Sequence, residues 1–491
     1  MKKVLKYSLL ILVISLCSCE KWLDIKPSDR LSEEMVFSDR EGYLKALNGV
    51  YVELTSTSLY GQNLSAGILD VMAQYYNAAS SSTYAYYYYQ KYTYTNASVK
   101  GTFDNIWQKS YQLIANCNTI IEKCGDSNEL LSEQYFGIIK GEALALRAML
   151  HMDLLRIFGP IYSQGSTTPA IPYMKTQDHE IQPLLSSEMI CENIIKDLTE
   201  AMNLLSSADP VITAGVKNNA NSSGDNSLNY RQYRLNFYAV KALLARTYLW
   251  KGDKENAFRV SEEIINSVQI PGSQIFPFVT SASATSSTIP DRVFSTEVLF
   301  SLYSSNRVQM HNALFLPTLE VNRRLSFAGT LTDGRVNELY DDKNDYRYKI
   351  WSNYNNNGTN VLYHRKFEDM SDTQGASNAW RYMVPLIRLS EVFLIAAESS
   401  SELATSVLYL NKVRNSKSCF SVTPASYDIL MNYVTQEYRK EMLGEGQLFF
   451  YYKRRALQNV PNGALAAGNV NVALTSYVVP LPDSEISQRI N

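Results

Sequence analysis

Residues suited to metal binding and redox chemistry are scarce in this sequence. Its 491 residues include four His and six Cys, and their spacing matches no zinc site. No Ser-His-Asp order, phosphate-binding loop or metal-ligand pattern stands out. We therefore expect a protein that is not an enzyme and that uses no cofactor and no metal.

An excess of charge of one sign is also missing. The 46 basic residues nearly balance the 48 acidic ones, and the formal net charge is -2. A nucleic-acid-binding protein normally shows a basic face. The composition therefore argues against nucleic acid as a partner.

The sequence has no stretch apolar and long enough to span a membrane. The apolar run 9–16 follows Lys2, Lys3 and Lys6, and it is shorter than the roughly 20 residues of a transmembrane helix. A positively charged start followed by a short apolar run is typical of a secretory signal. We expect residues 1–18 to be a signal peptide.

The end of this run, Leu16-Cys17-Ser18-Cys19, resembles a bacterial lipobox with Cys19 as the acylated residue. Cys17 is one alternative, although the residues before it fit less well, and an ordinary signal peptide with incidental cysteines is another. Each buried acyl CH₂ contributes ~0.8 kcal/mol, so two or more chains, such as palmitate, anchor a protein stably. We expect a lipid anchor at Cys19.

Four further cysteines remain in the chain, Cys117, Cys124, Cys191 and Cys419. The first two lie on one predicted helix at a separation of about 10 Å, which is too far for a disulfide. We expect four buried or free thiols.

Tyrosine is the abundant residue, with 35 Tyr against 17 Phe and 5 Trp. A tyrosine ring offers an apolar face and a polar tip, which suits a partly wet binding surface. The alternative is that most of these rings line the seams between helices.

The stretch 236–266 shows the clearest helical periodicity. Apolar residues recur at the spacing of one helix face over 240–248 and again over 257–264. Gly252-Asp253 separates the two runs and predicts a tight turn. The positions of Ala245, Tyr248, Gly252 and Ala257 resemble a tetratricopeptide repeat. We expect a helical scaffold here, with no contact to ligand.

The same patterns predict the other elements of the chain. Helices are expected at 41–55, 103–123, 132–158, 186–205, 390–401, 404–415 and 427–453, with a short strand at 297–302. The segment 80–98, rich in Tyr, is expected to be a loop or short strand. A flexible loop is expected at 206–229, irregular chain at 321–380, and an extended tail with one turn of helix at 477–491.

Several stretches line up in order with one family. They are 19–27 (CEKWLDIKP), 141–161, 242–253, 385–399, 407–416, 437–454 and 478–486 (VVPLPDSEI). Together they resemble the SusD/RagB family of surface nutrient-binding lipoproteins of Bacteroidetes. Tyr438 stands before Arg439 where the family usually has Glu, and 447–452 (QLFFYY) replaces its Arg-x-x-Asp-Leu. These departures leave the subgroup and the ligand open.

The resemblance implies a mostly α fold, a tetratricopeptide-like superhelix of about four helix pairs. Residues 19–491 would form one SusD-like domain. Its helical scaffold would cover about 40–60, 103–205, 237–266 and 385–454, and its irregular ligand or partner region about 61–100 and 268–384.

The resemblance also implies a function. The protein would be anchored in the outer membrane and face the cell exterior. It would bind an oligosaccharide and dock over a SusC-like TonB-dependent transporter. The alternatives are a peptide ligand, a periplasmic scaffold for envelope assembly and a hydrolase.

A sugar site combines aromatic faces, which stack on sugar rings, with amides and carboxylates that bond hydroxyls. Such groups usually lie on loops. The segment 75–94 and the stretch 351–357 (WSNYNNN) have this composition, and in the resembled family the segment before the Trp107 helix carries much of the ligand site. The expected ligand residues are Asp70, Gln74, Tyr75, Tyr76, Asn77, Tyr84, Tyr86, Tyr87, Tyr89 and Trp351. The alternative for the tyrosine run is a surface that contacts the transporter.

Other chemical groups have structural explanations. Glu437, Glu441 and Glu445 lie on one helical face among Arg439, Lys440 and Lys453, which predicts an ion-pair network. Arg388 and Glu391 are three apart and are expected to pair in the same way. His151 is expected to be a hydrogen-bonded core residue, and Trp107 is expected to pack in the core.

Overall fold

The computed structural model describes residues 33–177, 180–222, 224–370 and 378–490. The expected signal peptide and Cys19 lie outside these residues. Among the described helices, none is both long and apolar enough to cross a bilayer.

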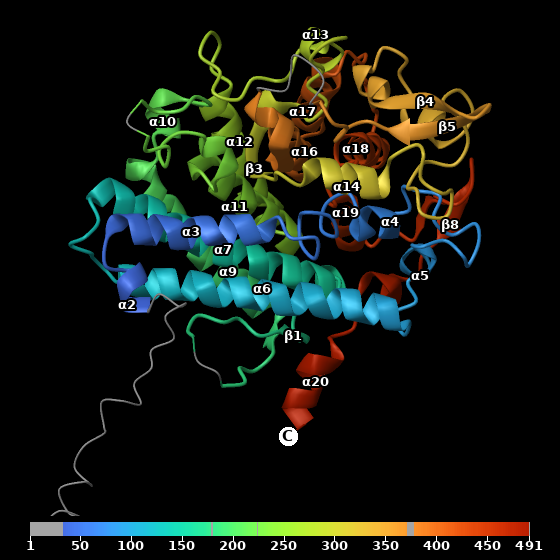
Figure 1. The fold of residues 1–491 in the computed structure, drawn as a ribbon. Coiled ribbons are helices and arrows are strands. Elements are labelled where there is room, and N and C mark those ends of the chain that lie inside the picture. Colours follow the sequence, from blue (N-terminus) through green and yellow to red (C-terminus); the bar gives the residue numbers. More distant parts are fainter. Residues whose placement is uncertain (1–32, 178–179, 223, 371–377, 491) are drawn as a thin grey trace, which may run out of the picture.

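Four helix pairs form the scaffold, as the resemblance implied (Figure 1). Each pair packs on the next: α6 on α7, α9 on α11, and α12 on α16. A last long helix, α18 (Tyr427–Glu441), packs on α16 and α17. The pairs are α3 (Arg40–Leu54) with α6 (Ala97–Cys124), α7 (Glu133–Phe158) with α9 (Ser187–Ala208), α11 (Phe237–Lys251) with α12 (Lys254–Val268), and α16 (Leu389–Ser399) with α17 (Leu403–Ser416).

Local sequence explains where these helices start and stop. The side chain of Asn236 accepts hydrogen bonds from the backbone N–H groups of residues 238 and 239 at the start of α11, which satisfies donors that a helix leaves free. Gly252 ends α11 with φ 83°, and Asp253 caps α12. The two-helix prediction for 236–266 is confirmed.

Helix α7 is buried from Gly137 to Phe158, as its apolar faces predicted. His151 lies fully in the core, where Nδ1 is 2.9 Å from the Arg147 carbonyl oxygen and Nε2 accepts from the Met174 N–H. Trp107 is also buried. Both structural assignments are confirmed, and the four cysteines inside the described residues are free and buried.

Three predicted helix bounds were wrong. The helix expected at 103–123 begins at Ala97. The helix expected at 427–453 is interrupted after α18, and α19 (Leu448–Arg454) begins a separate element. Gly446 between them has φ 68°, and a Cβ there would lie 2.2 Å from the Leu64 carbonyl oxygen, so the turn needs glycine. Helix α20 (Asp483–Ile490) is longer than the single turn expected.

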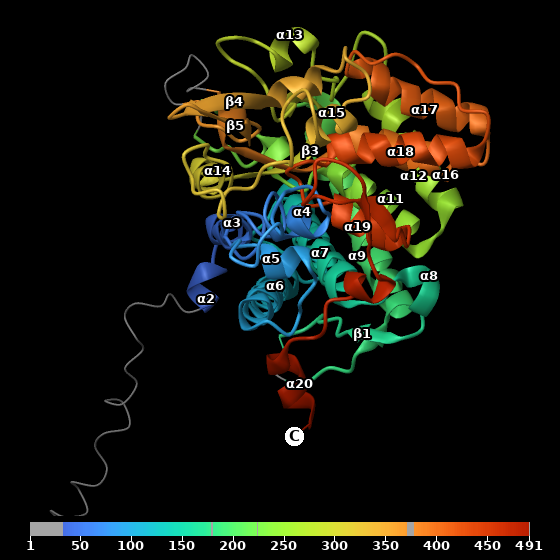
Figure 2. The same ribbon diagram turned by 90° about the vertical axis from the view of Figure 1, so that its right-hand side faces the viewer.

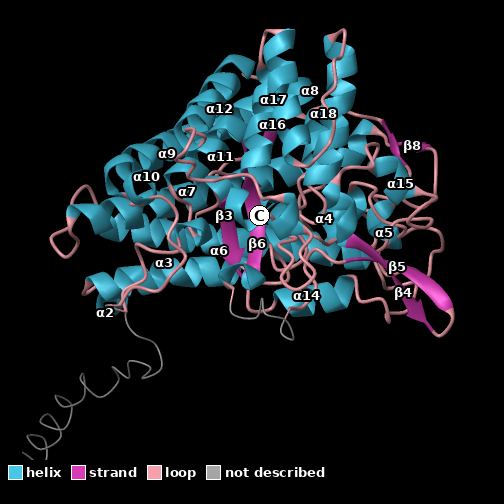
Figure 3. Cartoon of the chain, turned by 90° about the horizontal axis from the view of Figure 1, so that it is seen from above, coloured by secondary structure: helices cyan, strands magenta, loops and turns pink. Residues whose placement is uncertain are grey.

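The strands described form four two-stranded antiparallel sheets. Strand β3 (Val298–Tyr303) is near the predicted position and pairs with β6 (Met383–Arg388) close to the centre of the molecule (Figure 3). The region expected to be irregular contains the hairpin of β4 (Trp351–Asn356) and β5 (Thr359–His364). The remaining strands are β1 (Pro169–Ile171), β2 (Leu185–Ser186), β7 (Asn459–Pro461) and β8 (Asn469–Asn471).

Short helices fill the connections between scaffold and sheets (Figure 2). The loop expected at 206–229 includes the end of α9 and a short helix, α10. The short helices are α2 (Glu33–Val36), α4 (Ile68–Met72), α5 (Tyr87–Gln90), α8 (Tyr162–Gly165), α10 (Val211–Ala214), α13 (Ser281–Ala284), α14 (Arg307–Leu314) and α15 (Arg335–Leu339), with 3-10 turns η1 (Arg231–Tyr233), η2 (Ser295–Glu297), η3 (Tyr346–Ile350), η5 (Ala379–Tyr382) and η6 (Leu474–Tyr477).

The predicted ion-pair network is present and buried. Arg347 binds Glu437 at 2.9 Å and Glu441 at 2.6 Å, and Arg388 binds Glu445 at 2.8 Å. This buried ionic cluster joins α18 to the irregular chain and to β6. It consists of Glu297, Asp345, Arg347, Lys366, Arg388, Arg414, Lys417, Glu437, Lys440, Glu441 and Glu445.

Three partners in the expected network were wrong. Arg439 lies 3.4 Å from Glu338 and is not ion-paired with the three glutamates of the predicted face. Arg388 binds Glu297, Glu441 and Glu445, while Glu391 binds Arg246 at 2.7 Å. Arg388 stands at the N-cap of α16 with extended backbone, so the three-residue helical spacing does not bring it to Glu391. Lys453 donates to two carbonyl oxygens, of Ile157 and Gly159.

Candidate functional site

The expected ligand residue Asp70 lies in the core. Its carboxylate accepts hydrogen bonds from the backbone N–H groups of Gly444 at 2.7 Å and Gly446 at 3.1 Å, and from the Tyr76 hydroxyl at 3.3 Å. Burial raises the pKa of Asp70 to about 8. Asp70 therefore ties α4 to the turn between α18 and α19, which corrects the expectation of an accessible side chain.

Tyr75, Tyr76 and Trp351 are buried as well and pack around one phenylalanine. The rings of Tyr75 and Trp351 lie 5.9 Å and 4.4 Å from that of Phe327. The Tyr75 hydroxyl also donates to the Arg439 carbonyl oxygen at 2.6 Å. These three aromatic residues join the irregular chain to the scaffold, and the expectation that they are accessible is also corrected.

Gln74, Asn77 and Tyr89 hold their own segment together. Gln74 has left-handed backbone (φ 62°) and donates to the Gln90 carbonyl oxygen at 2.9 Å. Asn77 accepts from Ser80 at 2.6 Å, and the Tyr89 hydroxyl lies 2.7 Å from the hydroxyl of Thr102. Gln74 and Tyr89 are buried, whereas Asn77 is half-buried.

Tyr84, Tyr86 and Tyr87 remain at the surface of the segment and are half-buried. No other described residue hydrogen bonds to their hydroxyls. The backbone N–H of Ala85 donates to the Asn322 carbonyl oxygen at 2.8 Å, which places the segment beside the exposed residues Val321 and Arg323. We call the surface formed by Tyr84, Tyr86, Tyr87 and Tyr88 the tyrosine ridge. Part of it is the short helix α5, and not the loop or strand expected.

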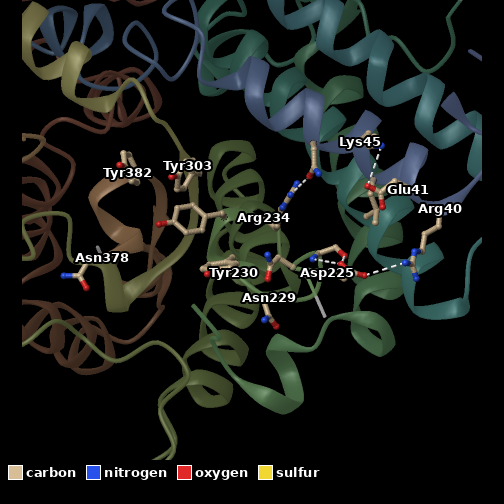
Figure 4. A pocket seen from close by; sticks show the side chains of 16 residues that line it. Arg40, Glu41, Lys45, Asp225, Asn229, Tyr230, Arg234, Tyr303, Asn378 and Tyr382 are labelled. Atoms are coloured by element: carbon tan, nitrogen blue, oxygen red, sulfur yellow. Dashed lines mark hydrogen bonds and ion pairs between the residues drawn. The ribbon is translucent and has the colours of Figure 1, made fainter. Parts of the chain in front are cut away.

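An open pocket of about 810 Å³ lies elsewhere, where α3, η1 and the ends of β3 and η5 meet (Figure 4). We call it the tyrosine pocket. One side is aromatic and the other is charged. Its lining residues include Arg40, Glu41, Lys45, Asn48, Asp225, Asn229, Tyr230, Tyr233, Arg234, Tyr303, Asn378 and Tyr382.

The end of the β3–β6 sheet creates the aromatic side. Strand β3 is buried up to Leu302, and the next residue, Tyr303, is 53% exposed. The backbone N–H of Ser304 donates to the Tyr382 carbonyl oxygen at 2.8 Å, which brings both tyrosines to one edge. Their ring centroids lie 4.9 Å apart, and Tyr233 meets Tyr303 edge-on at 5.6 Å. The pair presents a broad aromatic surface to solvent.

Tyr230 completes this side in a strained backbone conformation. Its φ is 53°, in the left-handed region, which costs a residue with a Cβ about 1–2 kcal/mol. Its N–H donates to the Lys217 carbonyl oxygen at 2.7 Å, and this contact helps to hold the turn. No other described residue bonds to the hydroxyls of Tyr230, Tyr303 or Tyr382. Within the described part of the chain, three hydroxyl groups without a partner therefore accompany the rings.

The charged side contains two carboxylates, each with a cation nearby. Asp225 lies 3.7 Å from Arg40 and accepts hydrogen bonds from Tyr135 and Ser227. The bonds from Ser227 and Tyr135 lower the pKa of Asp225 to about 2. Glu41 lies 3.7 Å from Lys45. Asp225 therefore stays ionised at neutral pH and is unsuited to donate a proton.

The tyrosine pocket was not predicted from the sequence. Its lining comes from residues 40–48, 224–234, 303 and 378–382, and no pattern within one of these stretches predicts the others. One local signal was present: Asn229-Tyr230 and Tyr233-Arg234 place aromatic and polar side chains directly before the scaffold helix at 237. The other was Tyr303 at the end of a predicted strand.

Comparisons with known proteins identify the family. Residues 210–488 match the family model SusD_RagB, described as "SusD family". The chain belongs to the SusD family. Residues 21–223 also match the model SusD-like_3, described as "Starch-binding associating with outer membrane". The family resemblance noted in the sequence is thus confirmed.

Relatives and solved structures match this chain over nearly its whole length. The SusD-like protein P2 of Formosa agariphila is 22% identical, over 100% of this chain and 98% of its own. A SusD superfamily protein from Bacteroides thetaiotaomicron has TM-score 0.71 at 20% identity, over 91% of this chain and 98% of its own. A SusD-like carbohydrate binding protein from Bacteroides vulgatus has TM-score 0.70 at 18% identity, over 92% of this chain and 97% of its own. These likenesses show a common fold.

Proposed function

We propose that this SusD-family protein binds an oligosaccharide outside the cell and delivers it to a SusC-like TonB-dependent transporter, without changing it chemically. Acylated Cys19 anchors it in the outer membrane. The observation that carries the proposal is the exposed tyrosine surface of Tyr303 and Tyr382 in an open pocket.

The chemistry of the tyrosine pocket suits a sugar. Exposed aromatic faces stack on the C–H faces of sugar rings, and neutral polar groups at their edge bond to hydroxyls in a partly wet site. Around Tyr303 and Tyr382, the amides of Asn48, Asn229 and Asn378 line the pocket. Its volume falls within the roughly 300–1,000 Å³ of small-molecule sites.

Among the described residues, the less exposed carboxyl group of this pocket, that of Asp225, is unsuited as the proton donor for hydrolysis. A glycosidase places two carboxyl groups about 5–10 Å apart, and one of them must hold a proton near neutral pH. The pKa of Asp225 lies at about 2, and Glu41 is ion-paired at the rim. This electrostatic arrangement favours binding over catalysis.

Two comparisons support the role at the family level. One family model is described as starch-binding and associated with the outer membrane, and one structure with the same fold is described as carbohydrate binding. The tyrosine ridge is then a second contact surface, for the outer part of the glycan or for the transporter.

Glycan binding is tested by titration calorimetry of the purified chain, residues 20–491, with a panel of oligosaccharides. We expect binding to at least one polysaccharide class, with Kd in the micromolar to millimolar range, and recovery of the glycan at its original length. Shortened products that disappear with a single carboxylate substitution would show an enzyme. Binding to peptides alone, in a parallel pull-down, would show the peptide alternative.

Surface placement is tested by protease treatment of intact cells. We expect the protein to be cleaved, and we expect Cys19→Ser to release it from the membrane fraction while Cys17→Ser does not. Complete resistance of the wild-type protein in intact cells, with cleavage after lysis, would indicate a periplasmic scaffold.

A further inference from the structure

The charges in the tyrosine pocket do not cancel. Three basic and two acidic side chains line it. Arg40 lies beside Asp225 and Lys45 beside Glu41, each pair at 3.7 Å. Arg234 is the third cation, and among the described residues no carboxylate lies within ion-pair distance of it. Among the residues that the structure describes, the pocket therefore has one positive charge without a partner of opposite sign.

Neutral groups hold Arg234 in place. Its Nη2 donates to the side-chain oxygen of Asn48, and its guanidinium lies 4.5 Å from the ring centroid of Tyr51. Its Nη1 is buried and has no hydrogen-bond partner among the described residues, so this part of the charge is also left uncompensated. These contacts orient the guanidinium without neutralising it, and a partly buried cation without a counter-charge favours an anion beside it.

The position of Arg234 connects the two sides of the pocket. It follows Tyr233 directly, and Figure 4 shows it between Tyr303 on the aromatic side and Asp225 on the charged side. A sugar ring stacked on the tyrosines would have its substituents toward this guanidinium. The planar guanidinium donates paired hydrogen bonds to carboxylate and to sulfate-like oxygens.

We infer that the oligosaccharide bound in the tyrosine pocket carries an anionic group, a carboxylate or a sulfate ester, and that Arg234 binds it. The inference rests on the proposed glycan-binding function and adds the charge class of the glycan. Arg40 and Lys45 are already compensated and contribute less to this selectivity.

The test uses titration calorimetry of the same purified chain, residues 20–491, with hexasaccharides of five polysaccharides. Polygalacturonate and alginate carry carboxylates, carrageenan carries sulfate, and starch and laminarin are neutral. We expect the tightest binding to an acidic hexasaccharide, and the carboxylate and sulfate arms decide which anion Arg234 prefers. Arg234→Gln should weaken that binding about tenfold or more, because it removes a charged hydrogen-bond donor.

Two controls separate lost charge from lost structure. Arg259→Gln removes an exposed arginine of α12 that belongs to neither the tyrosine pocket nor the tyrosine ridge, and it should change the affinity less than about twofold. Carboxyl-reduced or desulfated hexasaccharide should bind wild type and Arg234→Gln equally well, which a misfolded variant would not do.

The possible outcomes distinguish the charge assignment from the proposed glycan-binding function. Tightest binding to starch or laminarin, or an equal effect of Arg234→Gln and Arg259→Gln on the acidic ligand, would overturn the charge assignment and leave glycan binding intact. Failure of all five hexasaccharides to bind would overturn the proposed function and this inference together.

Discussion

Two tyrosine-rich regions of this protein use the same residue in opposite ways. Outside the tyrosine ridge, tyrosine hydroxyls of the segment 75–94 reach inward: Tyr75, Tyr92 and Tyr94 donate to carbonyl oxygens of residues 439, 72 and 476. In the tyrosine pocket, the hydroxyls of Tyr303 and Tyr382 have no such bonds to the described residues, and both tyrosines stand at the edge of a sheet. The density of tyrosine in a sequence therefore does not separate a seam from a binding surface.

The partner of the hydroxyl makes the difference. A buried tyrosine needs a hydrogen bond for its polar tip, and a nearby carbonyl from a distant part of the chain provides one. A tyrosine whose hydroxyl bonds to water can stay at the surface, and one face of its ring remains available for stacking on a ligand. We therefore expect substitutions of the inward-bonded tyrosines to alter stability, and substitutions of the pocket tyrosines to alter binding.

The largest expected effect comes from Tyr76→Ala. Tyr76 is fully buried beside Phe315 and Phe327, so its truncation should destabilise the fold by about 3–5 kcal/mol. Thermal unfolding followed by circular dichroism measures this loss, with Tyr88→Ala at the exposed ridge as control. Equal melting temperatures of the two variants would contradict the inward assignment.

A second effect depends on pH and on Asp70. Its folded pKa is raised to about 8 from 3.8 by burial, so the folded state retains a proton that the unfolded state releases. This contribution to stability is complete below pH ~4 and is lost as the pH rises toward ~8. Asp70→Asn should therefore gain stability relative to wild type across this window.

Melting temperatures of both proteins at several pH values from 4 to 9 measure this difference. Asp225→Asn is the contrasting control, because the pKa of Asp225 is lowered to about 2. Its favourable contribution is present above pH ~4 and is lost below it. A constant difference between wild type and Asp70→Asn at every pH would show that Asp70 is ionised in the fold.

A third prediction concerns binding by the pocket. Replacing both Tyr303 and Tyr382 with Ala should weaken glycan affinity about tenfold or more, since aromatic contacts of this kind contribute ~1–3 kcal/mol each. The melting temperature should change little. Tyr354→Ala, at an exposed position on the β4–β5 hairpin, is the matched control for calorimetry.

The smallest effect is expected at the tyrosine ridge. The triple variant Tyr84→Ala, Tyr87→Ala, Tyr88→Ala should change stability by no more than about 0.5 kcal/mol per residue, because these side chains are partly exposed. Its glycan affinity should fall less than that of the pocket variant. A larger loss of glycan affinity than in the pocket variant would place the main glycan site at the tyrosine ridge and not in the tyrosine pocket.

The sequence predicted the scaffold much better than the site. Helical periodicity and caps such as Asn236 and Gly252 are local, so α11 and α12 could be placed from neighbouring residues. The tyrosine pocket forms where α3, η1, β3 and η5 lie close together. These elements are far apart in the sequence, so their contact depends on tertiary packing. The partners of Arg388 were missed for the same reason, since Glu297 and Glu445 lie far away in sequence.

Hydroxyl-radical footprinting with mass spectrometry, with and without the bound oligosaccharide, tests the central claim most directly. We predict that ligand protects Tyr303 and Tyr382 from oxidation, while Tyr75 and Tyr76 react slowly in both samples because they are buried. Protection confined to Tyr84, Tyr87 and Tyr88, with Tyr303 and Tyr382 equally reactive in both samples, would contradict the account.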